Sequence, residues 1–170
     1  MCIVYISLRF SFILVIKMNI GEALSLLKKE KSRLARLISL RKENVYVEEG
    51  KKTEFDLKKL SEDIENKIVE IRKLKIRIQK TNINSKLDKD NLTIAEAIIK
   101  IGDIRSKLNH LSGLFERKRD RWYFDKETKV YIAQLDESEI EEQIEKLESE
   151  KNLLDNKIQI SNWNTELLNY

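Results

Sequence analysis

The sequence predicts an all-α protein made of two tandem helical hairpins, arranged as an antiparallel coiled coil or a four-helix assembly. Three observations carry this prediction: 36% of the 170 residues are charged, proline is absent, and apolar residues recur at helical spacing. Because proline interrupts helices more strongly than any other residue, a chain without it can form unusually long ones. Abundant Ile, Leu, Lys and Glu with few aromatics is typical of long amphipathic helices rather than of a sandwich, barrel or parallel sheet.

The chain from residue 18 onward contains an internal repeat. Two blocks recur in the same order in both halves: Asn19–Leu27 with Thr93–Ile101, and Ile78–Leu87 with Ile158–Leu167. The offset grows from 74 to 80 residues between the blocks, which places six additional residues in the middle of the second copy. We therefore predict one helical domain over residues 18–170, built from duplicated hairpins at 18–87 and 92–168.

Each half carries two apolar stripes at the three-and-four spacing of an amphipathic helix. The stripes are Ile20–Ile38, Leu57–Ile78, Ile94–Leu111 and Ile140–Ile158. In the first stripe we expect Leu24 and Ile38 to lie in the seam between helices, with Lys31 as its one polar break. Such narrow stripes suit coiled-coil packing better than a broad globular core.

The starts and ends of these helices are marked by capping residues. Thr93–Glu96 reads as a capping box, and Asn19–Glu22 is the same device with asparagine as the cap. Thr81–Asn84 and Ser161–Asn164 are matching stop signals, since asparagine tolerates the left-handed conformation that ends many helices.

Two segments at the far ends of the hairpins lack the helical pattern. Arg121–Gln134 has two β-branched and aromatic runs around four polar residues, which predicts a small β-hairpin. Val45–Val47 in the first half could add a third strand. The aromatic side chains of this end form either a local mini-core or a contact with another subunit. They are Tyr46, Trp122, Tyr123, Phe124 and Tyr131.

Residues 1–17 differ from the rest because they are almost wholly apolar. The run is shorter than the twenty or so residues of a membrane-spanning helix and contains Arg9. It also lacks the basic start and small-residue cleavage site of a signal peptide. We expect an upstream extension, with the working protein starting near Met18; the alternatives are a membrane anchor or secretion signal, and an ordered apolar arm.

The composition excludes several kinds of chemistry. One histidine, one cysteine and four isolated glycines exclude an intrachain disulfide, multi-cysteine zinc sites and a glycine-rich phosphate loop. We therefore predict a protein that is not an enzyme and uses no cofactor or metal. The lone Cys2 lies in the apolar segment, and a remainder without cysteine suits the cytoplasm; a retained segment 1–17 would instead indicate membrane association or secretion.

The formal charge of +4 is shared unevenly along the chain. Residues 136–160 hold three basic and nine acidic groups, whereas residues 18–44 hold seven basic and three acidic groups. An acidic helix among basic neighbours predicts pairing within the chain, so the overall balance does not favour nucleic acid as a partner.

Two groups of residues are candidate interaction sites. The first is the pair of stop motifs, which should gather at one end of the molecule: Asn82, Asn84, Asn162, Trp163 and Asn164. Capping explains the asparagines, but a tryptophan is costly in a plain cap and indicates an interface. The second is a basic run with aromatics: Arg117, Arg119, Arg121, Trp122, Tyr123 and Phe124. This run either binds phosphates and stacks bases, or is a solvated helix end whose cations are favoured by the helix dipole.

Four short motifs resemble the septicolysin-like family of small bacterial helical proteins. They are Ile20–Leu24, Val45–Gly50, Asp120–Trp122 and the ending Ile158–Leu168. The resemblance implies a start near Met18 and, through the family name, a cytolysin; it carries over no catalytic or binding residue. Outside residues 1–17, however, no segment is apolar enough to span a bilayer.

These observations favour a non-enzymatic structural or interaction protein that forms a homo-oligomer through its seams and its aromatic end. A membrane-acting cytolysin is the second hypothesis. A weak nucleic-acid binder acting through residues 117–124 is the third. The sequence identifies no protein partner, and it connects the chain to a membrane only through residues 1–17 or the cytolysin hypothesis.

Overall fold

The computed structural model describes residues 17–87, 91–115 and 132–169, and these ranges contain four helices. The helices are α1 (Ile20–Glu43), α2 (Leu57–Asn84), α3 (Ile94–Ser112) and α5 (Glu137–Asn164). α1 packs against α2, and α3 packs against α5. The prediction of an all-α fold with two helical hairpins is therefore confirmed for the described residues. We call α1 with α2 arm 1, and α3 with α5 arm 2.

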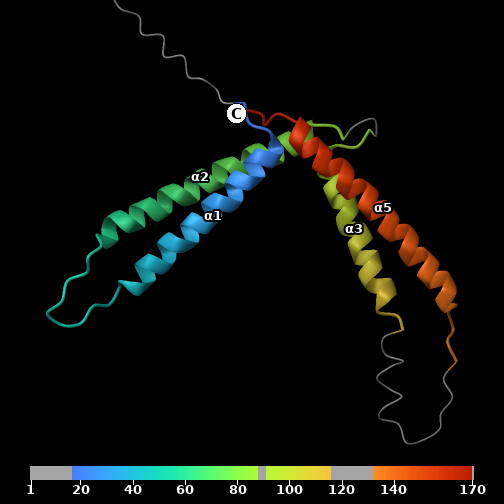
Figure 1. Ribbon diagram of the computed structural model, residues 1–170, viewed down its shortest axis with the longest axis horizontal. Coiled ribbons are helices and arrows are strands. Elements are labelled where there is room, and N and C mark those ends of the chain that lie inside the picture. Colours follow the sequence, from blue (N-terminus) through green and yellow to red (C-terminus); the bar gives the residue numbers. More distant parts are fainter. Residues whose placement is uncertain (1–16, 88–90, 116–131, 170) are drawn as a thin grey trace, which may run out of the picture.

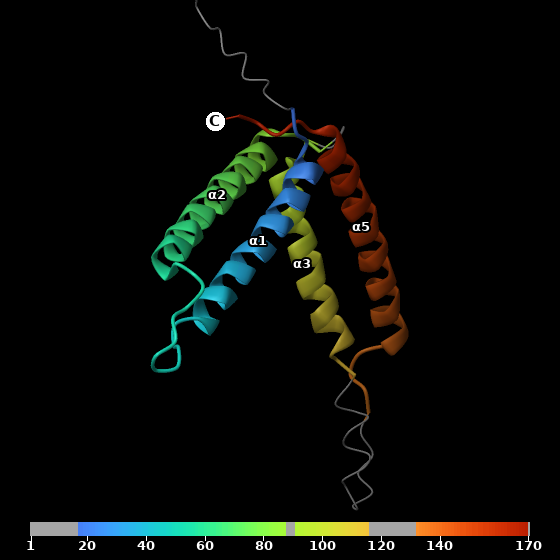
Figure 2. The ribbon, with the colours of Figure 1, turned by 60° about the vertical axis from the view of Figure 1, so that its left-hand side comes forward.

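The two arms diverge from a common end and form a V (Figure 1). At this end, which we call the apex, α1 and α3 begin and α2 and α5 end. Figures 1 and 2 both show α1 and α3 on the inner side of the V and α2 and α5 on the outer side. The helices therefore do not close into a four-helix bundle, and each arm is a pair of helices with much of its surface open to solvent.

Both predicted capping boxes form. Asn19 Oδ1 accepts a hydrogen bond of 2.8 Å from Glu22 N, and Asn19 N donates to Glu22 Oε2 at 2.9 Å. In the same way, Thr93 Oγ1 accepts from Glu96 N at 3.2 Å, and Thr93 N donates to Glu96 Oε2 at 2.7 Å. Each box supplies hydrogen-bond acceptors to two backbone N–H groups that have no partner within the first helical turn. Both inner helices therefore begin where the sequence predicts.

α2 and α5 end at Asn84 and Asn164, where the stop signals were expected. The chain leaves both helices in extended rather than left-handed conformation, with φ −104° and ψ 128° at Ser85 and φ −94° and ψ 121° at Thr165. Extended backbone can hydrogen-bond to another segment along its length. Both helix ends therefore continue as short segments that can pair across the apex.

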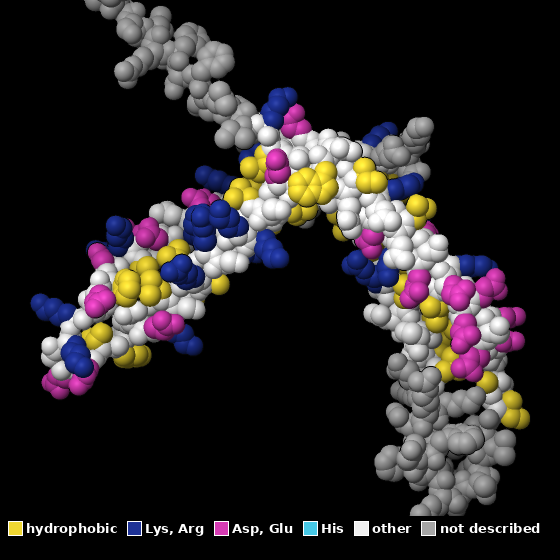
Figure 3. Space-filling view, viewed as in Figure 1, with side chains coloured by type: hydrophobic (Ala, Val, Ile, Leu, Met, Phe, Trp, Pro, Cys, Tyr) yellow, Lys and Arg dark blue, Asp and Glu magenta, His cyan; other side chains and the backbone are white. Residues whose placement is uncertain are grey.

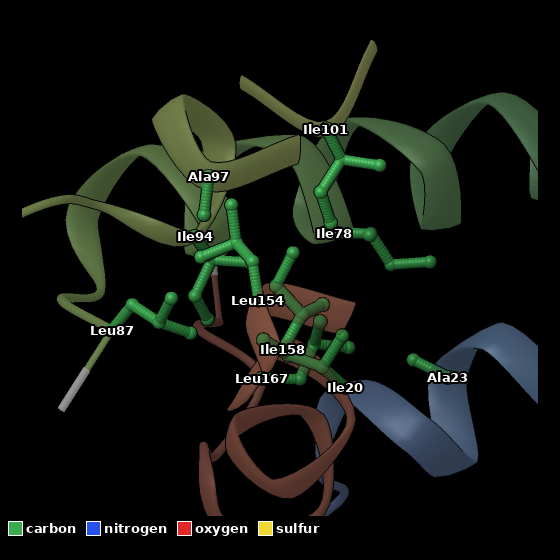
Figure 4. Packing of buried hydrophobic residues seen from close by; sticks show 10 residues of the cluster. All are labelled: Ile20, Ala23, Ile78, Leu87, Ile94, Ala97, Ile101, Leu154, Ile158 and Leu167. Carbon is green, nitrogen blue, oxygen red and sulfur yellow. The ribbon is translucent and has the colours of Figure 1, made fainter. Parts of the chain in front are cut away.

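The hydrophobic core lies at the apex and contains residues from all four helices (Figure 4). Its members are Ile20, Ala23, Ile78, Leu87, Ile94, Ala97, Ile101, Leu154, Ile158 and Leu167. Leu87 and Leu167 belong to the extended segments that follow α2 and α5, so these segments fill the core as well as connecting it. Farther along, each arm buries only its own seam, as at Ile64 in arm 1 and Ile140 in arm 2.

The buried face of α1 differs from the predicted one. Leu24 and Ile38, expected in the seam, are 41% and 43% exposed, whereas Ala23 is fully buried. Lys31, the expected polar break, is exposed, and the polar residue of the seam is Glu30. Two stripes of three-and-four spacing overlap on this helix, and only the helix packed against it decides which one is buried.

The predicted β-hairpin is not supported. The described residues contain no strand, only isolated bridges between Asn19 and Glu166 and between Lys86 and Thr93. Val45–Val47, the expected third strand, lies in the loop after α1 with its side chains exposed. Without a partner a short strand leaves its backbone groups unpaired, which explains why β-prone residues alone form none here.

Several expectations fall on residues outside the described ranges. Most of the predicted hairpin Arg121–Gln134 lies there, together with its aromatic residues up to Tyr131 and the apolar segment 1–16. Tyr46 is described and is exposed, so it does not contribute to an aromatic mini-core. Within the described ranges, no helix combines the length and hydropathy needed to cross a bilayer.

Candidate interaction site

At the apex, the start of α1 is hydrogen-bonded to the segment that follows α5. Ile20 N donates to Thr165 O at 3.1 Å, and Leu167 N donates to Met18 O at 2.7 Å. These two bonds form a short antiparallel bridge between the first helix of arm 1 and the last helix of arm 2. The backbone groups that the helix end would leave unpaired are thus satisfied by the opposite arm.

The same arrangement recurs where α3 meets the segment that follows α2. Ile94 N donates to Ser85 O at 2.9 Å, and Leu87 N donates to Leu92 O at 2.7 Å. These donors and acceptors stand at the repeat offsets of 74 and 80 residues from those of the first bridge. The apex is therefore built on a pseudo-twofold relation between the two hairpins.

This pattern adds a second level to the expected arrangement of the stop motifs. The sequence predicts that each hairpin brings the start of its first helix beside the end of its own second helix, and the antiparallel packing within each arm does so. The backbone bonds in addition connect the start of each hairpin to the end of the other one. The apex is consequently a junction of both arms, and loss of either bridge would loosen both.

Thr81 is the buried polar centre of this junction. Its Oγ1 donates to Arg77 O at 2.8 Å and accepts from Leu168 N at 3.1 Å. Arg77 holds the same segment from the side, since its Nε donates to Leu168 O at 3.2 Å and its Nη2 to Asn169 Oδ1 at 2.5 Å. The end of arm 2 is therefore fixed to α2 as well as to α1.

The asparagines selected from the sequence fill different roles at the apex. Asn84 Nδ2 donates to Lys80 O at 2.7 Å, which closes the last turn of α2. Asn82 is buried, and its Oδ1 accepts no hydrogen bond within the described part of the protein. Asn162 is half-buried, and Asn164 is exposed. Buried amide oxygens are rarely left without a hydrogen bond. The Oδ1 atom of Asn82 is therefore able to accept one from a water molecule or another donor.

Trp163 lies over the first turn of α1. A Cβ atom added at Gly21 would come within 2.8 Å of Trp163 Cδ2 and 2.9 Å of its Cε3, so the absence of a side chain at Gly21 is what admits the indole. The tryptophan is still 59% exposed. The sequence pattern selected Trp163 but missed Gly21. A signal was present: the repeat aligns Gly21 with Ala95, and a helical turn that accepts alanine in one copy does not require glycine in the other.

The second predicted group is not part of the described structure. Arg117, Arg119, Arg121, Trp122, Tyr123 and Phe124 all lie within 116–131, outside the described ranges. The contacts described at the apex do not involve these residues, and their binding of phosphates or bases stays a prediction.

The seam of arm 1 contains a charged pair near the middle of α1. Glu30 is 8% exposed; its Oε2 lies 3.0 Å from Lys67 Nζ, and its Oε1 accepts a hydrogen bond of 2.7 Å from Arg33. The Lys67 contact is short but off the direction of an ideal hydrogen bond. The Lys67 ammonium, followed by Arg33, holds the pKa of Glu30 below its ordinary value. Glu70, followed by Glu30, raises the pKa of Lys67.

The net charge of the two arms is opposite. The helices of arm 1 hold fifteen basic and seven acidic residues, whereas those of arm 2 hold six basic and ten acidic residues. Figure 3 shows acidic side chains gathered along α5. The expected pairing within the chain is seen toward α3, where Glu150 lies 2.8 Å from Lys100 and Asp155 lies 3.6 Å from Arg105. The strongly basic helices α1 and α2, however, lie in the other arm.

The concave surfaces of the arms are open grooves along helices. One of about 740 Å³ follows α2 beside Glu30, and one of about 470 Å³ follows α1 beside Leu24. A third, of about 430 Å³, contains His110 with Lys107 and Lys146. In the part of the chain that the structure describes, no three His, Cys, Asp or Glu side chains are grouped to hold a metal ion. Such surfaces can bind other helices by apolar contact and charge.

Comparison with known proteins places the chain among helical proteins without an assigned role. It is similar to a solved structure described as a functionally unknown conserved protein from Corynebacterium diphtheriae, with 25% identity, a TM-score of 0.78, and coverage of 89% of this chain and 99% of that one. No curated protein matches it.

The resemblance to septicolysin-like proteins is wrong, because residues 28–167 match a different family, DUF6847. Two of the four motifs behind that resemblance are the start of α1 and the end of α5, and such helix ends recur in unrelated helical proteins because every helix must satisfy its terminal backbone groups. Since the match spans most of the chain, the protein belongs to DUF6847, a family of unknown function.

Proposed function

We propose that the protein is a non-enzymatic helical interaction protein that associates with further copies of itself. The observation that carries the proposal is a set of large apolar side chains left exposed on the thin arms: Leu24, Ile38, Ile76, Ile98, Leu153 and Ile160. Single exposed apolar residues are common on protein surfaces, but Leu24 with Ile38 on α1 and Leu153 with Ile160 on α5 recur at multiples of seven residues. This spacing keeps each pair on one side of its helix and favours an interaction with another helix.

The chemistry of the described grooves supports a binding role rather than catalysis. They are shallow surfaces lined mainly by aliphatic, Lys and Glu side chains. His110 shares its groove with lysines, leucines and Gln143, and no serine, threonine or cysteine lines that groove. General acid–base or nucleophilic catalysis needs a reacting group within hydrogen-bond reach of a base.

The two alternative functions have different support. The cytolysin hypothesis depended on the septicolysin-like resemblance, which the DUF6847 match replaces, so we do not propose it. Weak binding of nucleic acid through residues 117–124 stays a prediction. Binding that persists after substitution of Arg117, Arg119 and Arg121 would contradict it, because phosphate contacts supply such affinity. A location in the cytoplasm likewise stays a prediction.

Self-association is tested by the mass of the purified protein in solution. We expect light scattering and sedimentation velocity to give a mass above the 20.2 kDa of one chain, rising with concentration in the micromolar range. The same measurement at high salt separates apolar from charge contacts, since salt screens exposed charges. A strictly monomeric protein at every concentration would contradict the proposal.

A further inference from the structure

α1 presents a row of exposed side chains that does not face α2. We call this row the α1 stripe; it consists of Leu24, Lys28, Lys31, Ala35 and Ile38. The positions alternate by four and three residues, which keeps them on one side of a helix and matches the spacing of a coiled-coil seam. A groove of about 470 Å³ follows most of this stripe. α1 therefore carries a second face with the spacing of a coiled-coil seam, beside the face packed on α2.

α5 presents a comparable row on the side away from α3. We call it the α5 stripe; it consists of Glu142, Glu145, Ser149, Leu153, Asn156 and Ile160, all of them exposed. Leu153 and Ile160 are 61% and 62% exposed, although Leu154 and Ile158 on the other side of the helix are buried. The apolar residues of this stripe lie toward the apex, and its glutamates lie toward the far end of arm 2.

The two stripes are continuous with a contact that already exists at the apex. Gly21 stands three residues before Leu24 on the α1 stripe, and Trp163 stands three residues after Ile160 on the α5 stripe. The indole of Trp163 packs on Gly21. The stripes thus meet at the apex and separate as the arms diverge. Beyond the apex, neither stripe is covered by the other.

The charges of the two helices are complementary. α1 holds seven basic and three acidic residues, whereas α5 holds three basic and eight acidic residues. Lysines stand in the middle of the α1 stripe, and glutamates stand on the α5 stripe. Complementary charge on two stripes that are only partly apolar promotes their encounter and selects against other pairings.

The repeat-related faces do not have the same complementarity. On α3, the stripe has Gly102 in place of Lys28, and Arg105 at the next position is already near Asp155. On α2, Lys73 and Lys80 replace the apolar Leu153 and Ile160. The duplication therefore copied the backbone but left one complementary pair of stripes, on α1 and α5.

We infer that the α5 stripe of one copy docks on the α1 stripe of a second copy. The inference rests on the proposed self-association and names the surfaces that perform it. Two copies can make this contact reciprocally, with arm 2 of each against arm 1 of the other. Such an arrangement closes into a dimer with twofold symmetry, in which both stripes of both copies are covered.

The test is a charge exchange with a matched control. Lys28→Glu with Lys31→Glu places two acidic residues on the α1 stripe; Lys29→Glu with Arg36→Glu makes the same charge change on a third side of α1. We expect the stripe variant to weaken self-association by about tenfold or more and the control by much less, as measured by sedimentation. Circular dichroism checks that both variants keep their helices.

A second variant makes the partner explicit. Glu142→Lys with Glu145→Lys on α5 should also weaken its own self-association, because both stripes are then basic. Mixing this protein with the Lys28→Glu, Lys31→Glu variant should restore a dimer, since both contacts between the unlike chains are again complementary. Native mass spectrometry distinguishes the mixed dimer when one variant is isotope-labelled.

The outcomes separate the two proposals. A wild-type protein that is monomeric throughout overturns both. A wild-type oligomer that the α1-stripe variant leaves intact, or that the control weakens equally, overturns the inference but not self-association. X-ray scattering that shows a monomer with its arms closed on each other would mean that the stripes pair within one chain, and it would overturn the inference as well.

Discussion

The two arms share a backbone design but hold their seams together differently. In arm 1 the middle of the seam contains Glu30 and Lys67. The repeat places Ile104 and Leu147 at the corresponding positions of arm 2. Ile104 is buried, and Leu147 is half-buried. One hairpin therefore uses a charged pair where the other uses an apolar pair.

This difference shows which positions of the hairpin tolerate a change of chemistry. The apex keeps the same apolar residue types in both copies, as at Ile20 and Ile94 or Leu87 and Leu167. The exchanged pair lies farther along the arms, where only two helices pack and polar ends of long side chains can reach solvent.

Removing one member of the charged pair should have the largest effect. Lys67→Leu leaves Glu30 in the seam of arm 1 with one cation fewer, so we expect a clear fall in the denaturation midpoint in urea. Adding Glu30→Ile reproduces the arm 2 pair in arm 1 and should recover the loss, because a well-packed apolar pair commonly matches or exceeds a buried ion pair in stability.

The reciprocal exchange in arm 2 is the control for this prediction. Ile104→Glu alone should destabilise the protein, and adding Leu147→Lys should restore part of the loss. A Glu30→Ile, Lys67→Leu protein that is less stable than the Lys67→Leu single variant would show that the two seams are not interchangeable.

The tryptophan contact should give an intermediate effect that only arm 1 shows. Gly21→Ala forces the indole of Trp163 to move, and we expect a loss of about 1 kcal/mol from overpacking. In a Trp163→Ala background the same substitution should be neutral or stabilising, because alanine is the better helix former by up to about 1 kcal/mol. The free energy of unfolding in urea for the four variants of this cycle gives the coupling.

The matched position in the second repeat supplies the comparison. Ala95→Gly should cost about 0.5–1 kcal/mol through backbone entropy alone, and this cost should not depend on Trp163. An effect of Gly21→Ala that is unchanged by removal of the indole would contradict the proposed packing.

The smallest expected effect is a pH dependence confined mainly to arm 1. The pKa of Glu30 is lowered from 4.5, chiefly by Lys67, so its contribution is present above that value and is lost as pH falls through the folded-state pKa. The pKa of Lys67 is raised from 10.5, chiefly by Glu70, so its contribution is present below that value and is lost as pH rises through the folded-state pKa. The seam of arm 1 should therefore be most protected between these limits.

Hydrogen exchange, corrected for intrinsic rates, measures this difference. Comparison of neutral pH with a pH below 4.5 should show a greater loss of protection in the middle of α1 and α2 than in the middle of α3 and α5. Arm 2 has lowered pKa values at Glu96, through its bond to Thr93, and at Glu142, through exposed Lys146. Glu96 acts on the start of α3 rather than on its middle, and an exposed pair such as Glu142 with Lys146 contributes little to stability. Equal loss in both arms would contradict the prediction.

Much of the fold was accessible from local sequence, and the exceptions have physical causes. The capping boxes at Asn19 and Thr93 and the ends of α2 and α5 could be predicted because caps act within one turn. The choice between Ala23 and Leu24 as the buried residue of α1 could not, since both positions fit the same helical period. Gly21 was missed for a related reason. The lack of a side chain at this position matters only because Trp163, far away in the sequence, lies over it.

By itself, the sequence determined that the chain forms helices, where α1 and α3 start and where α2 and α5 end, and that the second hairpin repeats the first. These properties depend on spacing, caps and the absence of proline, which are local. Only the tertiary structure decided that the hairpins diverge as a V and that each one binds the end of the other through Ile20 and Ile94. Such pairings join residues far apart in the chain, so they depend on which apolar faces meet at the apex. The helical spacing of apolar residues does not specify which faces meet.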